Sequence, residues 1–75
     1  IEENIFRQEL IVEINKIIEN LPEKFRVPLI LYYLFEQPIG EIAKEIKKPP
    51  GTVKSRLFKG RSLIKKRLEE LGYGK

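Results

Sequence analysis

The 75-residue chain contains no cysteine, no histidine and no methionine. Disulfide bridges and the usual zinc-ligand sets are therefore excluded, and a core of Ile, Leu, Val, Phe and Tyr suits a reducing cytoplasm, where we expect the protein to act. With only scattered carboxylates left, the sequence offers no nucleophile–base pair and no phosphate-binding glycine loop, so we expect neither an enzyme nor a cofactor. Because the chain starts at Ile1 and lacks methionine, we expect it to be excised from a longer protein.

Charge is divided sharply along the sequence. Residues 1–46 carry five basic residues and nine glutamates, a net charge of −4, whereas residues 47–75 carry ten basic residues and two glutamates, a net charge of +8. From Lys47 to Arg67 there are nine cations and no acidic residue. A solvated helix face ordinarily mixes both signs through Glu–Lys pairs. The asymmetry therefore favours a polyanionic partner.

Apolar residues recur at three- and four-residue steps throughout the chain, which predicts an all-α fold. Breaks at residues 20–22, 37–38 and 47–51 separate four predicted helices. They cover residues 2–20, the segment from about Pro22 to about 35, residues 39–46, and a last helix that begins at one of residues 49–51 and ends at about 71, with Gly72 as a C-terminal cap. We expect one small four-helix domain that occupies residues 1–75. Its expected core residues are Ile5, Phe6, Leu10, Ile14, Ile17, Ile18, Leu21, Phe25, Leu29, Tyr32, either Tyr33 or Leu34, Ile39, Ile42, Ala43, Ile46, Val53, Leu57, Gly60, Ile64, Leu68 and Leu71.

A short helix, a tight turn and a longer helix form a helix-turn-helix pattern, which we expect at about residues 39–58 with a recognition helix at about 50–71. Projected at about 100° per residue, the longer helix has a core side and an opposite side. The opposite side carries cationic, hydroxyl and aromatic groups that suit base edges in a DNA major groove, with two arginines on its flanks where phosphates would lie. These residues are Lys54, Ser55, Phe58, Lys59 and Ser62, flanked by Arg56 and Arg61.

Three segments, LPEKFRVPLILYY, IGEIAKEI and PPGTVKSRLFKGRSLIKKRL, resemble the C-terminal promoter-recognition domain (region 4) of bacterial sigma factors, in particular the extracytoplasmic-function group. The resemblance covers about residues 21–68. It implies a four-helix unit whose last helix reads the upstream (−35) promoter element in double-stranded DNA. Its other face would bind the flap of the RNA polymerase β subunit, with an anti-sigma factor as a competing partner. The resemblance also implies base contacts by Lys54, Ser55, Phe58 and Lys59, and backbone contacts by Thr52, Arg56, Lys47 and Lys48.

Three residues depart from that family pattern. Pro38 stands where a serine or threonine N-cap is usual, so we expect the short helix to begin without a side-chain cap. Lys47 replaces a glycine or asparagine, so a left-handed backbone there would carry strain. Lys48 replaces an apolar residue and adds a cation near the DNA.

Other functions remain open at the level of sequence. A LuxR-type response-regulator domain also begins its recognition helix with TVK, although that family usually continues with a histidine that this chain lacks. A module that acts mainly through protein partners, an anti-sigma factor or the polymerase flap, would have the same fold. We expect no membrane partner, because the basic amphipathic helix needs its apolar side for a core and no apolar run approaches bilayer-spanning length.

Overall fold

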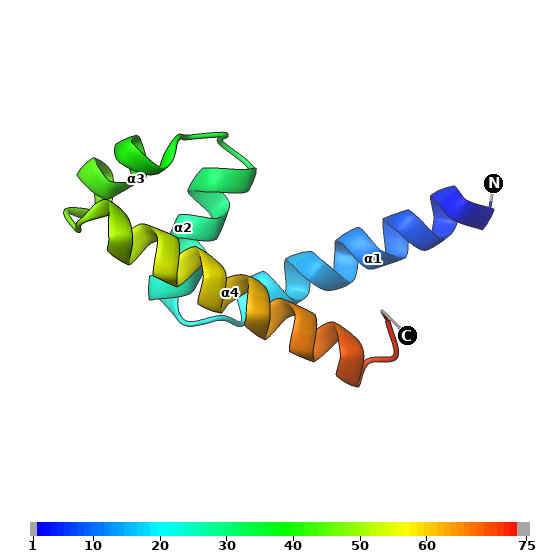
Figure 1. The fold of residues 1–75 in the computed structure, drawn as a ribbon. Helices are drawn as coiled ribbons and strands as arrows, with labels where there is room; N and C mark the ends of the chain where they lie inside the picture. Colours follow the sequence, from blue (N-terminus) through cyan, green and yellow to red (C-terminus); the bar gives the residue numbers. More distant parts are fainter. Residues whose placement is uncertain (1, 74–75) are drawn as a thin grey trace.

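The computed structural model describes the backbone of residues 2–73 and the side chains of residues 7–73. Within that part of the chain there is no strand, and the four helices are α1 (Glu2–Glu19), α2 (Glu23–Tyr33), α3 (Ile39–Ile46) and α4 (Pro50–Glu70). In Figure 1, α2 and α3 lie over the first half of α4, while α1 extends away from them in the same general direction as the second half of α4. The predicted all-α fold with a C-terminal helix-turn-helix is confirmed.

Prolines define where three of the helices begin. Pro22, Pro38 and Pro49 are the N-caps of α2, α3 and α4, and none of these helices has a side-chain cap. The second proline of the pair, Pro50, opens α4 without loss, because a first-turn amide has no intrahelical partner to give up. The predicted uncapped start of the short helix at Pro38 is therefore confirmed.

The turn between α3 and α4 consists of Lys47, Lys48 and Pro49. Lys47 adopts a left-handed backbone with φ 59° and ψ 46°, which is uncommon for a residue that has a Cβ. The backbone N–H of Lys48 donates to the carbonyl oxygen of Ala43 at 3.0 Å and closes the end of α3. The turn is thus short and strained at the residue where the sequence predicted it, and it sets α3 against the start of α4.

The core joins α2, α3 and α4. One buried cluster contains Leu29, Ile42, Ala43, Val53 and Leu57. These positions were all predicted to lie in the core. They fix the orientation of α4, since its apolar side is committed to the two preceding helices.

Gly60 marks the closest approach between α2 and α4. It is buried, and a Cβ built on it would lie 2.8 Å from Cδ1 and 3.3 Å from Cγ of Leu29. Leu29 is itself only 2% exposed and has little room to move away. The absence of a side chain at Gly60 therefore allows the two helices to pack this tightly.

The end of α2 differs from the prediction. The helix ends at Tyr33 and not at Phe35, because Leu34 is its C-cap and Glu36 turns the chain with a left-handed φ of 53°. Tyr33 and Leu34 are 52% and 71% exposed, so the prediction that one of them is buried was wrong. Phe35, the next residue, is 67% exposed, so the chain leaves the core here and returns to it only in α3.

The end of α4 also differs slightly. Leu71 is the C-cap and 41% exposed, so its assignment to the core was wrong. It lies just past the last helical residue, in the groove between α1 and α4, where it is only partly covered. Gly72 follows with φ 95°, the conformation expected of a residue just after a helix.

α1 contributes least to the core. Within residues 7–19 it buries Ile17 alone, while Ile11 and Val12 are more than half exposed. The other predicted positions of this region are half-buried at Leu10, Ile14, Ile18 and Leu21, and the side chains of Ile5 and Phe6 lie outside the described residues. The amphipathic pattern thus predicted the helix correctly but overestimated how much of its apolar side is covered.

Candidate nucleic-acid interface

The first half of α4 has buried and exposed residues on opposite sides. Lys54, Ser55, Phe58 and Lys59 are all exposed, and we call these four residues the recognition stripe. Phe58 is 67% exposed although its neighbour Leu57 is only 2% exposed, as the rotation of about 100° between adjacent helical residues requires. The predicted orientation of all four side chains is therefore confirmed, while their contacts with DNA stay predictions.

Ser55 has its hydroxyl proton engaged within the helix. Its Oγ donates to the carbonyl oxygen of Gly51 at 3.1 Å, one turn earlier in α4. Serine in a helix commonly bonds back in this way. With the proton directed along the helix, the oxygen lone pairs remain free to accept a hydrogen bond from a partner in front of the stripe.

The residues predicted to contact the DNA backbone lie around the start of α4. Lys47 and Lys48 are exposed in the turn, while Thr52 and Arg56 are half-buried on α4 itself. Arg56 borders a shallow groove formed with the first turns of α2 and with Ile46. Its aliphatic stem is therefore supported by protein, which leaves less conformational freedom for the guanidinium to lose on binding.

Arg61 differs from the other flanking residues. Its guanidinium donates to Tyr33 Oη at 2.8 Å, so it points toward α2. Sequence periodicity predicted its place on the flank of α4 but not this partner, which lies 28 residues earlier in the chain. Only one of the five guanidinium N–H donors is used in this bond, so the others remain available for a phosphate.

The charge around the recognition stripe is uncompensated. Among the residues with described side chains, the ion pairs are Lys16–Glu13 at 3.7 Å, Lys44–Glu41 at 3.9 Å and Arg67–Glu70 at 3.2 Å. All three pairs lie outside the stripe and outside the turn. Lys54 and Lys59 therefore keep their ammonium groups available for an external anion.

An apolar groove that the sequence pattern did not predict lies between α1, α2 and α4. It has a volume of about 600 Å³ and is lined mainly by aliphatic and aromatic side chains, with Arg61 at its edge. The lining residues include Ile14, Ile18, Ile30, Tyr33, Leu34 and Ile64. The sequence does carry one signal for this groove, because the apolar run after Pro28 continues past the end of α2 into exposed positions.

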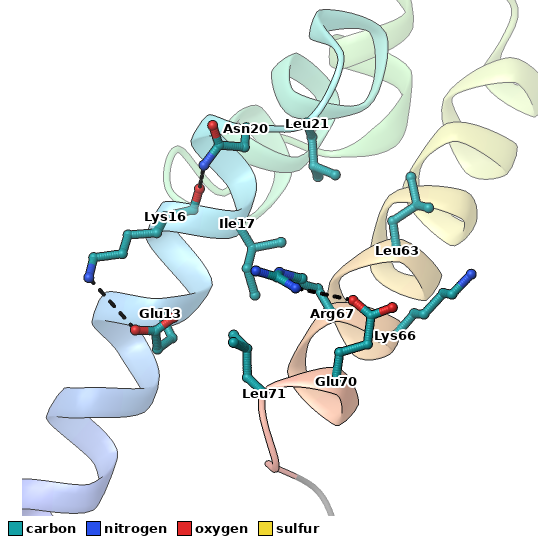
Figure 2. Close-up of a pocket in the computed structure, with 10 residues that line it drawn as sticks. All are labelled: Glu13, Lys16, Ile17, Asn20, Leu21, Leu63, Lys66, Arg67, Glu70 and Leu71. Atoms are coloured by element: carbon teal, nitrogen blue, oxygen red, sulfur yellow. Dashed lines mark hydrogen bonds and ion pairs between the residues drawn. The ribbon is translucent and has the colours of Figure 1, made fainter.

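A second groove, of about 490 Å³, lies on the other side of α1 and is lined by charged as well as apolar side chains. Figure 2 shows Ile17, Leu21 and Leu63 between α1 and α4, the Glu13–Lys16 pair along α1 and the Arg67–Glu70 pair on α4. Because both carboxylates already have cationic partners, we assign this groove no ligand. It is part of the contact by which α1 rests on α4.

Comparison with known proteins identifies the family. Residues 11–64 match the family described as sigma-70, region 4. The chain is 36% identical over 70 residues to the ECF RNA polymerase sigma factor SigW of Bacillus subtilis (strain 168), covering 93% of this chain and 37% of that protein. It is 34% identical over 70 residues to the RNA polymerase sigma-H factor of Pseudomonas aeruginosa, covering 93% of this chain and 36% of that protein.

The matched residues include α2, α3 and the part of α4 that carries the recognition stripe. They support the sigma-factor interpretation over the LuxR-type alternative and over catalysis, since the family is not enzymatic. Within residues 2–73 no helix is long and apolar enough to cross a bilayer. The chain spans a little over a third of the length of these two relatives. It belongs to the sigma-70 region 4 family, whose members bind the −35 promoter element.

Proposed function

We propose that this chain places RNA polymerase at promoters by inserting the first half of α4 into the major groove of the −35 element. The observation that carries the proposal is Phe58, which is 67% exposed on the side of α4 opposite the core, next to lysines that make no ion pair within residues 7–73. An exposed ring among lysines serves no purpose in packing. It suits contact with a thymine methyl group or a sugar edge.

Each residue of the recognition stripe has a distinct role in this proposal. Lys54 and Lys59 donate to guanine O6 or N7, and Phe58 contacts an apolar base edge. Ser55 accepts a hydrogen bond from an exocyclic amine of adenine or cytosine, because its own proton is held by Gly51. Specificity therefore resides in four side chains that share one side of one helix.

Contacts to the phosphates fix the position of α4 without reading sequence. Lys47 and Lys48 in the turn, and Thr52 and Arg56 in α4, make these contacts. Arg61 joins them through the guanidinium N–H donors that do not bond to Tyr33. A backbone contact of this kind contributes affinity for every duplex alike.

The apolar groove between α1, α2 and α4 is the surface that we propose for the flap of the RNA polymerase β subunit, with an anti-sigma factor as a competitor. Leu34 lines the groove and is 71% exposed, so apolar surface is left there for a partner to cover. None of the recognition-stripe residues lines the groove, and Arg61 is its one residue among the proposed DNA contacts, so we propose that polymerase and DNA can be bound at once. We also propose that residues 1–75 form one domain of a longer protein that acts in the cytoplasm, where its DNA and polymerase partners are found.

The test compares matched and scrambled duplexes. A matched duplex is first selected from a random pool, and binding of Lys54→Ala and Lys59→Ala is then measured by fluorescence anisotropy. Each change should cost about 1–3 kcal/mol on the matched duplex and less on the scrambled one. Lys16→Ala, on α1, is the control and should bind as wild type does. Equal losses on both duplexes would reassign the two lysines to phosphate contacts.

A further inference from the structure

We propose that α4 carries a second DNA contact beyond the recognition stripe, made to phosphates by Ser62, Lys65 and Lys66, which we call the distal cluster. The inference rests on the proposed function, because it requires the recognition stripe to lie in the major groove. It extends the interface by about two helical turns.

The distal cluster repeats the arrangement of the stripe further along α4. Ser55 and Lys59 are four residues apart, and Ser62 and Lys66 have the same spacing seven residues later. Seven residues make about two turns of an α-helix, so Ser62 lies on the same side of α4 as Ser55. At about 100° per residue, Lys65 and Lys66 project on either side of Ser62.

The three side chains of the distal cluster are available to bind. All are exposed, and among residues 7–73 none of them makes an ion pair or a side-chain hydrogen bond with another described residue. Figure 2 shows the Lys66 side chain extending away from α1, whereas Arg67 next to it bonds to Glu70 at 3.2 Å. Lys66 thus differs from Arg67 in having no anionic partner among the described residues.

Helix and groove dimensions place the distal cluster near the DNA backbone. With a rise of about 1.5 Å per residue, Ser62 lies about 10 Å along the axis from Ser55. The major groove is about 12 Å wide, and a recognition helix contacts bases through its N-terminal residues. When Ser55 faces the base edges, Ser62 and the two lysines therefore reach the rim of the groove. A hydroxyl and two ammonium groups are suited to phosphate oxygens there.

The end of α4 limits how far this contact extends. Glu69 and Glu70 follow directly, and no acidic residue precedes them as far back as Lys47. Carboxylates repel phosphates, so the cationic side of α4 ends within one turn after Lys66. The distal cluster is therefore a bounded site and not the start of a longer basic tail.

The first experiment measures the salt dependence of DNA binding for Lys65→Ala and Lys66→Ala, with Lys16→Ala as the charge-matched control. Each phosphate contact contributes about −0.9 to the slope of log affinity against log salt. The slope measured for each distal variant should therefore be shallower by about that amount. The loss should be equal on matched and scrambled duplexes, and the control should keep the wild-type slope. Circular dichroism of each variant checks that the helices are retained, and Lys65→Gln and Lys66→Gln repeat the test with a polar side chain.

The second experiment replaces single phosphates with neutral methylphosphonates across and beyond the matched site. Wild type should lose affinity at one or two positions outside the bases that it reads, and Lys66→Ala should be insensitive to the replacement at one of them. Unchanged slopes and an unchanged methylphosphonate pattern in both distal variants would overturn the distal contact. In that case Lys54→Ala and Lys59→Ala would still lose affinity mainly for the matched duplex, and the proposed base reading would stand. If those two variants instead lose matched and scrambled binding equally, it is the base-reading role that fails.

Discussion

α1 and α4 are the two long helices of this domain, and they use their apolar residues differently. α4 buries Val53, Leu57 and Gly60 against α2 and α3 and leaves its cationic side open. α1, over residues 7–19, buries Ile17 alone and leaves Ile11 and Val12 exposed. Both helices are amphipathic in sequence, so the difference in burial comes from the helices against which each of them packs.

The comparison separates two uses of an amphipathic helix. In the first half of α4 the apolar side is buried in the core, which fixes the direction of the opposite, cationic side. In α1 the apolar side is only partly covered and borders the apolar groove through Ile14 and Ile18. In the function that we propose, α4 reads DNA, and α1 together with the end of α2 binds protein.

The largest expected effect contrasts the apolar residues of the two helices. Leu57→Ala removes a side chain at the centre of the core and should lower the free energy of unfolding by about 2–5 kcal/mol. Ile11→Ala changes an exposed residue of α1 and should alter it by no more than about 0.5 kcal/mol. Urea unfolding followed by circular dichroism measures both. Similar losses in the two variants would show that α1 is as firmly packed as α4.

A smaller effect is expected at the contact between α2 and α4. In Gly60→Ala the new Cβ would lie 2.8 Å from Leu29 Cδ1, so the helices must separate or Leu29 must change rotamer. Such overpacking typically costs about 1–3 kcal/mol. Gly40→Ala is the control, because a Cβ at Gly40 meets nothing within 4 Å. Thermal and urea unfolding should show the loss for Gly60→Ala alone, and equal stability of the two variants would contradict the close approach.

The smallest of these effects concerns DNA affinity and leaves the fold intact. Arg56→Ala removes one predicted phosphate contact, so the slope of log affinity against log salt should become shallower by about 0.9. The loss should be the same on matched and scrambled duplexes, as anisotropy titrations at several salt concentrations can measure. A loss confined to the matched duplex would make Arg56 a base-reading residue instead.

Much of the fold was predictable because proline and periodicity act locally. The prolines at positions 22, 38 and 49 set the starts of three helices, and the turn at Lys47 took the left-handed backbone that the family pattern implied. The orientation of Phe58 followed from its position one residue after Leu57. These features depend on neighbours in sequence, so the sequence contains them.

The remaining features depend on contacts between distant residues. The bond between Arg61 and Tyr33 joins α4 to α2, and no spacing rule connects those positions. The early end of α2 depends on the backbone of Glu36, a residue without any turn signature in its side chain. The apolar groove depends on the same region, because Tyr33 and Leu34 line it and face away from the core.

The central claim is that α4 packs the core with one side and reads DNA with the other, and Phe58→Ala tests it most directly. Its unfolding free energy and its affinities for matched and scrambled duplexes are measured on the same preparation. We predict that stability stays within about 1 kcal/mol of wild type, far from the 3–5 kcal/mol lost when a buried Phe is truncated, and that the preference for the matched duplex falls. A stability loss of about 3–5 kcal/mol with an unchanged preference for the matched duplex would return Phe58 to the core and contradict the account.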